Sequence, residues 1–361
     1  MTWWVRVLVG IGALALVGVL GFNLLKKQIA AVVFNSFVLE RVGTDPSAEL
    51  PDGLHVYMCG TGSPLPDPSR AGPCIGVLAG ERAYVFDVGS GGVRNLGLMG
   101  FPTAKLEAVF LTHLHSDHFD GLGEMLLNAW IAGSRADPLS VYGPPGIVSV
   151  VDGFNAAYEV DGGFRTAHHG REVANPEGRG GAAIEISMPT DQTGSSIVFA
   201  DQDLKVTAIR VSHEPVDPAY GYRIDYKGRS VSISGDTVYS ETFAAASSGV
   251  DIMFHEALDP ELVRKIGDAM LARGALVAAK IFSDIPDYHA TPEDAAKAAA
   301  EAEARALVYY HTIPPMPVSF LEPLFLEGVD KEYDGSVTIG QDGFLYSLPA
   351  GSDRIIFDGL L

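Results

Sequence analysis

The chain has 361 residues, of which 47% are hydrophobic and 19% are charged, and this composition excludes an intrinsically disordered protein. The first 35 residues hold three basic residues and no acid, so the remainder carries 22 basic and 45 acidic residues, a net charge of −23. Such an acidic surface repels the phosphate backbone of nucleic acid over most of its area. We therefore do not expect nucleic acid to be a partner.

The first element is an uncharged apolar run from Val7 to Leu25, which ends at Lys26 and Lys27. At about 1.5 Å per residue, a helix of this length nearly crosses a hydrocarbon core of roughly 30 Å. No A-x-A cleavage pattern follows the lysines, which favours an uncleaved anchor over a cleaved signal peptide. We therefore expect residues 1–35 to be a membrane anchor or signal anchor, with the catalytic part outside the cytoplasm (periplasmic or extracellular).

A polar, turn-prone stretch follows, and we expect a linker over residues 36–53 and a single domain over residues 54–361. Short apolar runs between Gly- and Pro-rich turns predict strands. These runs cover 55–59, 74–78, 83–87, 107–112, 139–142, 204–211, 221–226, 230–234, 252–254 and 306–310. Residues 119–131, 260–280 and 291–305 and a stretch after Pro145 have helical spacing, whereas residues 162–192 are expected to be irregular. This order predicts an α/β (α+β) sandwich of two mixed sheets with helices outside.

Two cysteines, Cys59 and Cys74, occur near the end of one predicted strand and the start of the next. Neither lies in a C-x-x-C or zinc-finger spacing. The sequence leaves two interpretations open, which are a disulfide in an exported domain and a pair of buried thiols.

The segment Thr112-His113-Leu114-His115-Ser116-Asp117-His118 follows a predicted strand and precedes a predicted helix. Three imidazoles and a carboxylate within six residues are costly to crowd together unless a cation binds them. His113 and His115 alternate by two and can point the same way from an extended chain. This pattern predicts a metal site.

The H-x-H-x-D-H string resembles the signature of the metallo-β-lactamase superfamily. Two glycine-rich segments upstream, Cys59–Pro64 and Phe86–Gly91, are similar to loops of the group that contains tRNase Z and the zinc-dependent arylsulfatases. Further pieces of the pattern follow in the superfamily's order. They are His213, Ser234-Gly235-Asp236-Thr237, His289 before a capped helix, and His311 after a strand. The resemblance implies a four-layer αββα sandwich and a hydrolase.

The resemblance also implies that each chain binds two Zn²⁺ ions, or other divalent metals, and it implies which residues are their ligands. His113, His115 and His213 would bind the first zinc, and Asp117, His118 and His311 the second. Asp236 would bridge the two. Such a site leaves coordination positions open for water and substrate, and a metal-bridging hydroxide would be the nucleophile.

Other residues are implied in supporting roles. Asp87 would orient a ligand through hydrogen bonds rather than bind metal. His289 would assist the leaving group, Glu256 would orient or recharge His289, and Asp117 would also hold the attacking hydroxide. Three residues of the irregular segment are candidate substrate contacts: Arg165, His168 and His169.

We expect a small-molecule ester-type substrate, namely a sulfate ester, carboxylic ester, lactone, amide or β-lactam. Two alternatives stay open, which are a phosphodiesterase or RNA-processing nuclease of tRNase Z type and an iron-dependent sulfur dioxygenase of the same fold. The sequence leaves the oligomeric state open, and a homodimer is one option.

Overall fold

The computed structural model describes residues 2–188, 194–201, 203–316 and 318–361. The chain divides into two compact units, Met1–Pro46 and Ser47–Leu361. The second unit carries both β-sheets and every residue singled out above as a candidate for chemistry.

The first unit is formed by one long helix, α1 (Trp3–Arg41). Its stretch Trp3–Glu40 has a mean hydropathy of 2.3 in the most apolar window, and it is long and apolar enough to cross a membrane by length and composition. The helix continues to Arg41, into the stretch expected as linker, because no Gly or Pro interrupts residues 36–41. It ends just before Gly43, whose φ of +79° is incompatible with helix.

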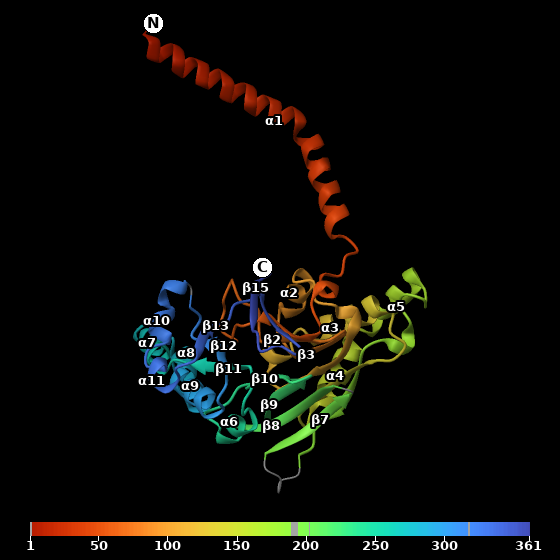
Figure 1. The fold of residues 1–361 in the computed structure, drawn as a ribbon, viewed down its shortest axis with the longest axis vertical. Coiled ribbons are helices and arrows are strands. Elements are labelled where there is room, and N and C mark those ends of the chain that lie inside the picture. The colour runs from red at the N-terminus through yellow and green to blue at the C-terminus, as the bar shows by residue number, and fades with distance from the viewer. Residues whose placement is uncertain (1, 189–193, 202, 317) are drawn as a thin grey trace. The chain divides into compact units, whose positions relative to one another are not determined.

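The second unit contains two mixed sheets that lie face to face (Figure 1). In the described part of the chain, the first sheet has eight strands in the order β15-β14-β1-β2-β3-β4-β5-β6, and the second has seven in the order β13-β12-β11-β10-β9-β8-β7. The strands of the first sheet are β1 (Gly53–Gly60), β2 (Cys74–Ala79), β3 (Arg82–Val88), β4 (Leu106–Phe110), β5 (Leu139–Gly143), β6 (Gly181–Glu185), β14 (Phe344–Pro349) and β15 (Ile356–Gly359). Those of the second are β7 (Ser195–Asp201), β8 (Leu204–His213), β9 (Val216–Tyr226), β10 (Arg229–Ile233), β11 (Ile252–Leu258), β12 (Ala306–Ile313) and β13 (Ser336–Ile339).

The core lies between the sheets, where alternate strand residues of each sheet meet. Phe86 of β3 contacts Tyr222 of β9, with ring centroids 5.3 Å apart, and Phe110 of β4 stacks on Phe86 at 5.0 Å. Apolar strand runs of this kind need burial on both faces, so each sheet also requires an outer cover.

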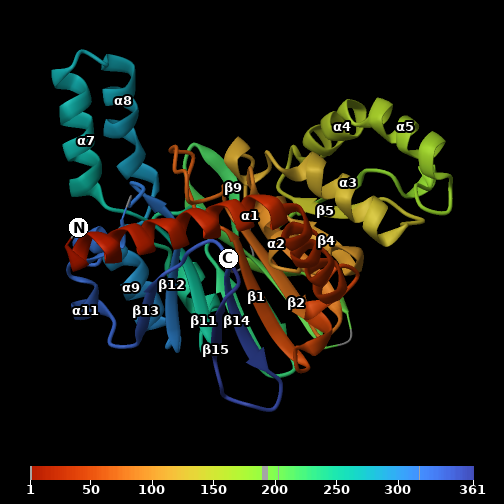
Figure 2. The same ribbon diagram turned by 90° about the horizontal axis from the view of Figure 1, so that it is seen from above.

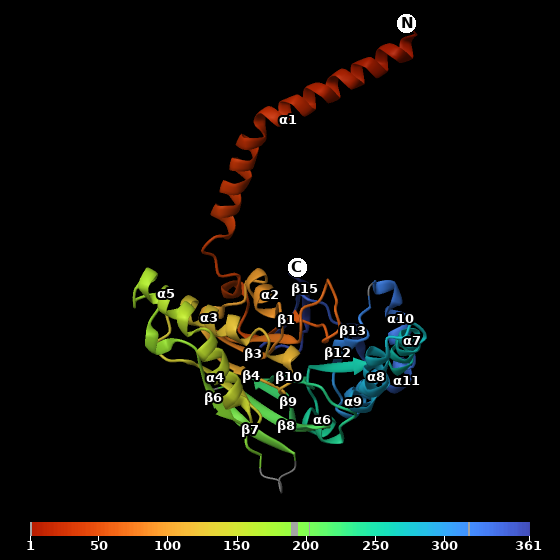
Figure 3. The same ribbon diagram turned by 180° about the vertical axis from the view of Figure 1, so that it is seen from behind.

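Helices provide that cover (Figures 1 and 3). Apolar side chains of α2, α3 and α4 pack on the outer face of the first sheet, and those of α6, α9, α10 and α11 pack on the second. The helices of this unit are α2 (Gly92–Leu98), α3 (Leu122–Gly133), α4 (Ile147–Ala157), α5 (Glu159–His169), α6 (Glu241–Ala246), α7 (Pro260–Ala272), α8 (Leu276–Asp284), α9 (Pro292–Glu301), α10 (Glu322–Phe325) and α11 (Val329–Glu332). The predicted mixed α/β sandwich is therefore confirmed.

Two segments differ from the sequence prediction. The stretch 162–192, expected to be irregular, contains most of α5 and all of β6, while its residues 189–192 lie outside the described residues. The single helix expected over 260–280 is a hairpin of α7 and α8, because Gly274 at φ +75° reverses the chain between them. Cys59 and Cys74, left open by the sequence, form a disulfide between β1 and β2.

Candidate metal centre

The H-x-H-x-D-H segment leaves the end of β4 and passes through a single 3₁₀ turn, Ser116–His118. Asp87, at the end of β3, fixes this segment. Its two carboxylate oxygens accept hydrogen bonds from the backbone N–H and the hydroxyl of Thr112, each 2.8 Å long, and Nδ1 of His118 lies 2.8 Å from the same carboxylate. Asp87 thus positions the segment from beneath, and it adopts a φ of +54° to do so.

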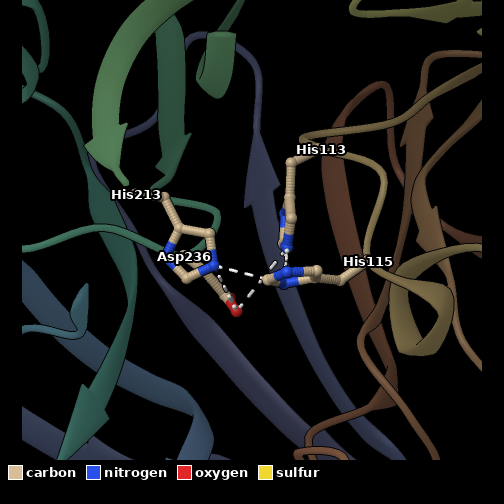
Figure 4. Close-up of side chains that lie close together, drawn as sticks. All are labelled: His113, His115, His213 and Asp236. Carbon is tan, nitrogen blue, oxygen red and sulfur yellow. Dashed lines mark hydrogen bonds and ion pairs between the residues drawn. The ribbon is translucent and has the colours of Figure 1, made fainter. Parts of the chain in front are cut away.

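Three overlapping groups of potential ligands come together at one end of the sandwich, and the first two contain the predicted ligands. The first consists of His113, His115, His213 and Asp236, whose ligand atoms lie within 4.8 Å of one another (Figure 4). The second consists of Asp117, His118 and His311, and the third, which shares a residue with each of the others, consists of Asp236, His289 and His311. The segment 113–118 contributes to the first and the second group. His213 lies in β8, Asp236 in the loop after β10, and His311 in β12.

One carboxylate oxygen of Asp236 lies close to histidines of both the first and the second group. This oxygen, Oδ2, lies 3.4 Å from Nε2 of His118 and of His311 and 3.9 Å from Nε2 of His113 and of His213. Burial alone would raise the pKa of Asp236, but the neighbouring imidazoles of His311 and His118 hold that pKa well below its ordinary value. The carboxylate is therefore charged and shared by the two groups.

Three buried polar atoms of this cluster lack a hydrogen-bond partner. They are Nε2 of His118, Nδ1 of His311 and Oδ1 of Asp236. In addition, Nε2 of His113 lies only 3.0 Å from Nδ1 of His115. Unpaired buried nitrogens and a buried carboxylate are costly unless a cation satisfies them. Imidazole and carboxylate are the donors that zinc and similar divalent metals bind. The residues thus fit a metal centre.

His289 lies beside this cluster, and it adjoins Glu256 of β11. Nδ1 of His289 is 3.0 Å from Oε1 of Glu256, and the same oxygen accepts from the backbone N–H of Thr237 and of Ala290. Burial would lower the pKa of His289, but the Glu256 carboxylate raises it above the ordinary value. The pairing that the sequence order suggested is therefore present in the structure.

Sequence reasoning missed two backbone contacts that fix the ligands. The carbonyl of Tyr288 lies 2.8 Å from Nδ1 of His213, and the hydroxyl of Tyr310 accepts from the backbone N–H of Gly235, next to Asp236. Neither contact leaves a signal in the local sequence, because each joins residues more than 70 positions apart.

Three predicted substrate contacts lie elsewhere. Arg165 pairs with Asp161 on its own helix at 2.7 Å, and His168 and His169 are exposed at the end of α5. None of the three lines the cavity at the metal centre. Helix α5 lies at the opposite end of the second unit from α8, which does line it (Figures 2 and 3). The three side chains are thus excluded from the cavity, and their contact with a larger substrate away from the metal centre stays a prediction.

Comparison with known proteins agrees with this architecture. A family model described as a beta-lactamase superfamily domain matches residues 100–312. The chain belongs to this superfamily. Ribonuclease Z of Mycobacterium marinum is 32% identical over 291 residues, which make up 80% of this chain and 96% of that protein. Ribonuclease Z of Mycobacterium bovis is 34% identical over 296 residues with the same coverage.

Solved structures of the superfamily show the same fold. The crystal structure of human tRNase Z, short form, matches with a TM-score of 0.57 at 22% identity, covering 82% of this chain and 99% of that chain. The predicted resemblance to the tRNase Z-like group is thus confirmed, and the chain is a metal-dependent hydrolase.

The relatives overturn one expectation. We expected a small-molecule substrate and no nucleic-acid partner, whereas these superfamily relatives are ribonucleases. The inference from net charge was wrong because the total charge of a domain does not determine the field at a site that bound cations would make positive.

Proposed function

We propose that this chain is a dizinc phosphodiesterase of ribonuclease Z type, with RNA as its substrate class. The observation that carries the proposal is the pair of ligand groups sharing Asp236, with the His289–Glu256 pair beside them. Support for the substrate class comes from the similarity to ribonucleases Z over 96% of their length.

We assign the ligands by group. His113, His115 and His213 would hold one zinc, Asp117, His118 and His311 the other, and Asp236 would be shared. When bound, the two zinc ions would lower the pKa of a water into the neutral range and polarise a phosphoryl oxygen. Asp87 acts through Thr112 and His118 as a positioning residue, since it reaches the ligands only by hydrogen bonds.

His289 supplies the proton for the leaving oxygen in this proposal. Its Nδ1–H donates to Oε1 of Glu256, and the carboxylate raises the pKa of the ring, which favours a second proton on Nε2. Glu256 acts through His289 as a positioning residue. It is completely buried, and the two backbone N–H groups that donate to the same oxygen hold it in place.

The test uses full-length protein loaded with zinc and an RNA that carries a 3′ extension. We expect cleavage that a chelator abolishes and zinc restores, with about two zinc ions per chain by elemental analysis. Asp236→Ala should lower the content of both metals and reduce cleavage to background. Asp152→Ala, which removes an exposed carboxylate of α4 that does not line the cavity, is the matched control and should cleave normally. Absence of RNA cleavage by a chain that holds two zinc ions would exclude the proposed substrate class.

A further inference from the structure

The cavity at the metal centre has a volume of about 270 Å³ and two chemically different sides. One side presents the ligand groups, including Asp117, Asp236 and His311. The other presents apolar side chains, including Leu65, Ile281 and Ile285. The described residues that line the cavity include no lysine or arginine.

Ile281 lies near the C-terminal end of α8 and Ile285 directly after it, at the base of the α7–α8 hairpin, which stands away from the two sheets (Figure 2), and Leu65 comes from the loop after β1. Ile281 of α8 is 51% exposed, although it is a large aliphatic residue beside a polar centre. Ile285, one turn further, is 8% exposed and packs with Leu258, Val263 and Ile313. The hairpin is thus anchored at its base, and it leaves an apolar surface open toward the cavity, where a ligand group can cover it.

The chemistry of the two sides restricts what can fill the cavity. A phosphate belongs on the metal side. A second phosphate on the other side would meet aliphatic carbon and no cationic side chain among the lining residues. An uncharged flat ring would instead remove apolar surface from water and contact the aromatic ring of Tyr288, which also lines the cavity.

We propose that the apolar side, formed by Leu65, Ile281 and Ile285, is the subsite for the nucleobase of the nucleotide attached to the scissile phosphate. This inference rests on the proposed function, because it places that nucleotide's phosphate at the metal centre. Aliphatic contact and stacking do not read hydrogen-bonding edges, so the subsite accepts any base and gives affinity rather than sequence specificity.

The test measures binding and does not depend on turnover. Full-length zinc-loaded protein in lipid nanodiscs is titrated by calorimetry with uridine 5′-monophosphate and with methyl phosphate, which share the phosphate and differ in the nucleoside. We expect the nucleotide to bind about 10-fold more tightly than methyl phosphate. Ile281→Asp should weaken binding of the nucleotide more than binding of methyl phosphate, so that most of that difference is lost.

The matched control is Val277→Asp, which introduces the same charge one turn earlier on α8 at a residue that is 79% exposed and does not line the cavity. It should keep the preference for the nucleotide. Because Ile281 is itself half exposed, its replacement should leave the circular dichroism spectrum unchanged.

Two results would overturn the inference: equal affinity of the wild type for both ligands, or an unchanged preference in Ile281→Asp. A failure of the proposed function looks different. In that case RNA is not cleaved by the zinc-loaded enzyme, while the nucleotide preference and its loss in Ile281→Asp persist.

Discussion

Each buried polar side chain of this centre would destabilise the fold if its partners were absent, and the cost of its burial is offset only when all of them are present. Asp236 is 3% exposed, and Glu256 and His118 are completely buried, yet all three are polar or charged. Leaving one charge buried without its partner costs about 3–5 kcal/mol, so removal of any one partner should destabilise the rest. The conformations of Asp87 and His311, with φ values of +54° and +47°, fit the same picture of residues held in place by their surroundings.

His289 provides a prediction about mechanism. If it protonates the leaving oxygen, its loss should matter most for leaving groups of high pKa, and it should matter little for a nitrophenolate. General acid catalysis contributes about 10²- to 10⁴-fold. We expect kcat/KM of His289→Ala to depend more steeply on leaving-group pKa than that of the wild type, measured over a series of aryl and alkyl phosphodiesters. Parallel slopes at full zinc content would assign His289 a structural role instead.

The cluster His113–His118 could be predicted from the sequence because its chemistry is local, with four potential ligands in six residues. His213, Asp236 and His311 needed the order of motifs, since each is a single residue after a strand. The apolar side of the cavity could not be predicted. Leu65 and Ile281 are more than 200 positions apart, and an aliphatic residue on a helix normally indicates core.

At the scale of elements, hydrogen-bonded ion pairs connect strands of the second sheet near their ends, where the backbone hydrogen bonds between the strands cease. Asp251, just before β11, accepts from Arg229 of β10 at 2.8 and 2.9 Å and from Arg305, just before β12, at 2.7 Å. Arg229 also donates to the carbonyls of Pro349, Ser352 and Arg354 in the C-terminal segment. This network, which is buried at Arg229 and Asp251 and exposed at Arg305, ties three neighbouring strands of the second sheet to the C-terminal segment.

The network predicts a pH dependence of stability. Burial would raise the pKa of Asp251, but hydrogen bonds from Arg229, the backbone N–H of Ser230 and Arg305 hold that pKa below its ordinary value. Its contribution is therefore complete above about pH 5 and is lost progressively as the pH falls through the lowered pKa. We expect Asp251→Asn to cost about 3 kcal/mol at pH 7 and to have a flatter stability profile between pH 3 and 5, measured by urea unfolding.

The matched control for this substitution is Asp268→Asn, which removes the same charge from an exposed i,i+4 pair with Arg264. That pair should contribute less than about 1 kcal/mol. Equal losses for the two variants would contradict a role for the buried network.

Most strands could be predicted from apolar runs between turn residues, because burial on both faces leaves a clear signature. Strands β6, β7, β13, β14 and β15 were missed. Four of them, β6, β7, β13 and β15, lie at the edges of the sheets, where mixed exposure weakens the pattern. Strand β6 was also difficult to recognise because the sequence around it is rich in Gly and charged residues.

At the scale of the whole molecule, the net charge of −23 over residues 36–361 predicts an unusual salt response for a nuclease. The acidic surface repels RNA at long range, and this repulsion is screened beyond about 8 Å at 0.15 M salt. We expect kcat/KM for RNA to rise as KCl increases from about 20 to 150 mM. A steep fall with salt, as seen when phosphates displace counterions on a basic surface, would instead reveal a local cationic binding face.

We further propose that α1 stays attached and holds the chain at a membrane, with the second unit outside the cytoplasm, so that the RNA it cleaves would be RNA of that compartment. Support comes from the length and hydropathy of α1 and from the Cys59–Cys74 disulfide, which forms in oxidising compartments. Fractionated cells should hold the full-length chain in the membrane pellet after a carbonate wash, and both cysteines should resist thiol labelling until reduced. A soluble protein that begins after Lys27 would identify the segment as a cleaved signal peptide.

The pairing of β1 with β14 has a consequence for synthesis of the chain. Gly53 of β1 is opposite Pro349 of β14, and His55 contacts Ser347 at 2.9 Å, so the first strand made has one of its two neighbours among the last. At about 5–20 residues per second, β1 waits roughly 15–60 s with one edge open before β14 emerges. During that interval the open edge can pair with another chain. If translation stopped before residue 344, the truncated chain would lack β14 and β15, and one edge of β1 would stay unpaired.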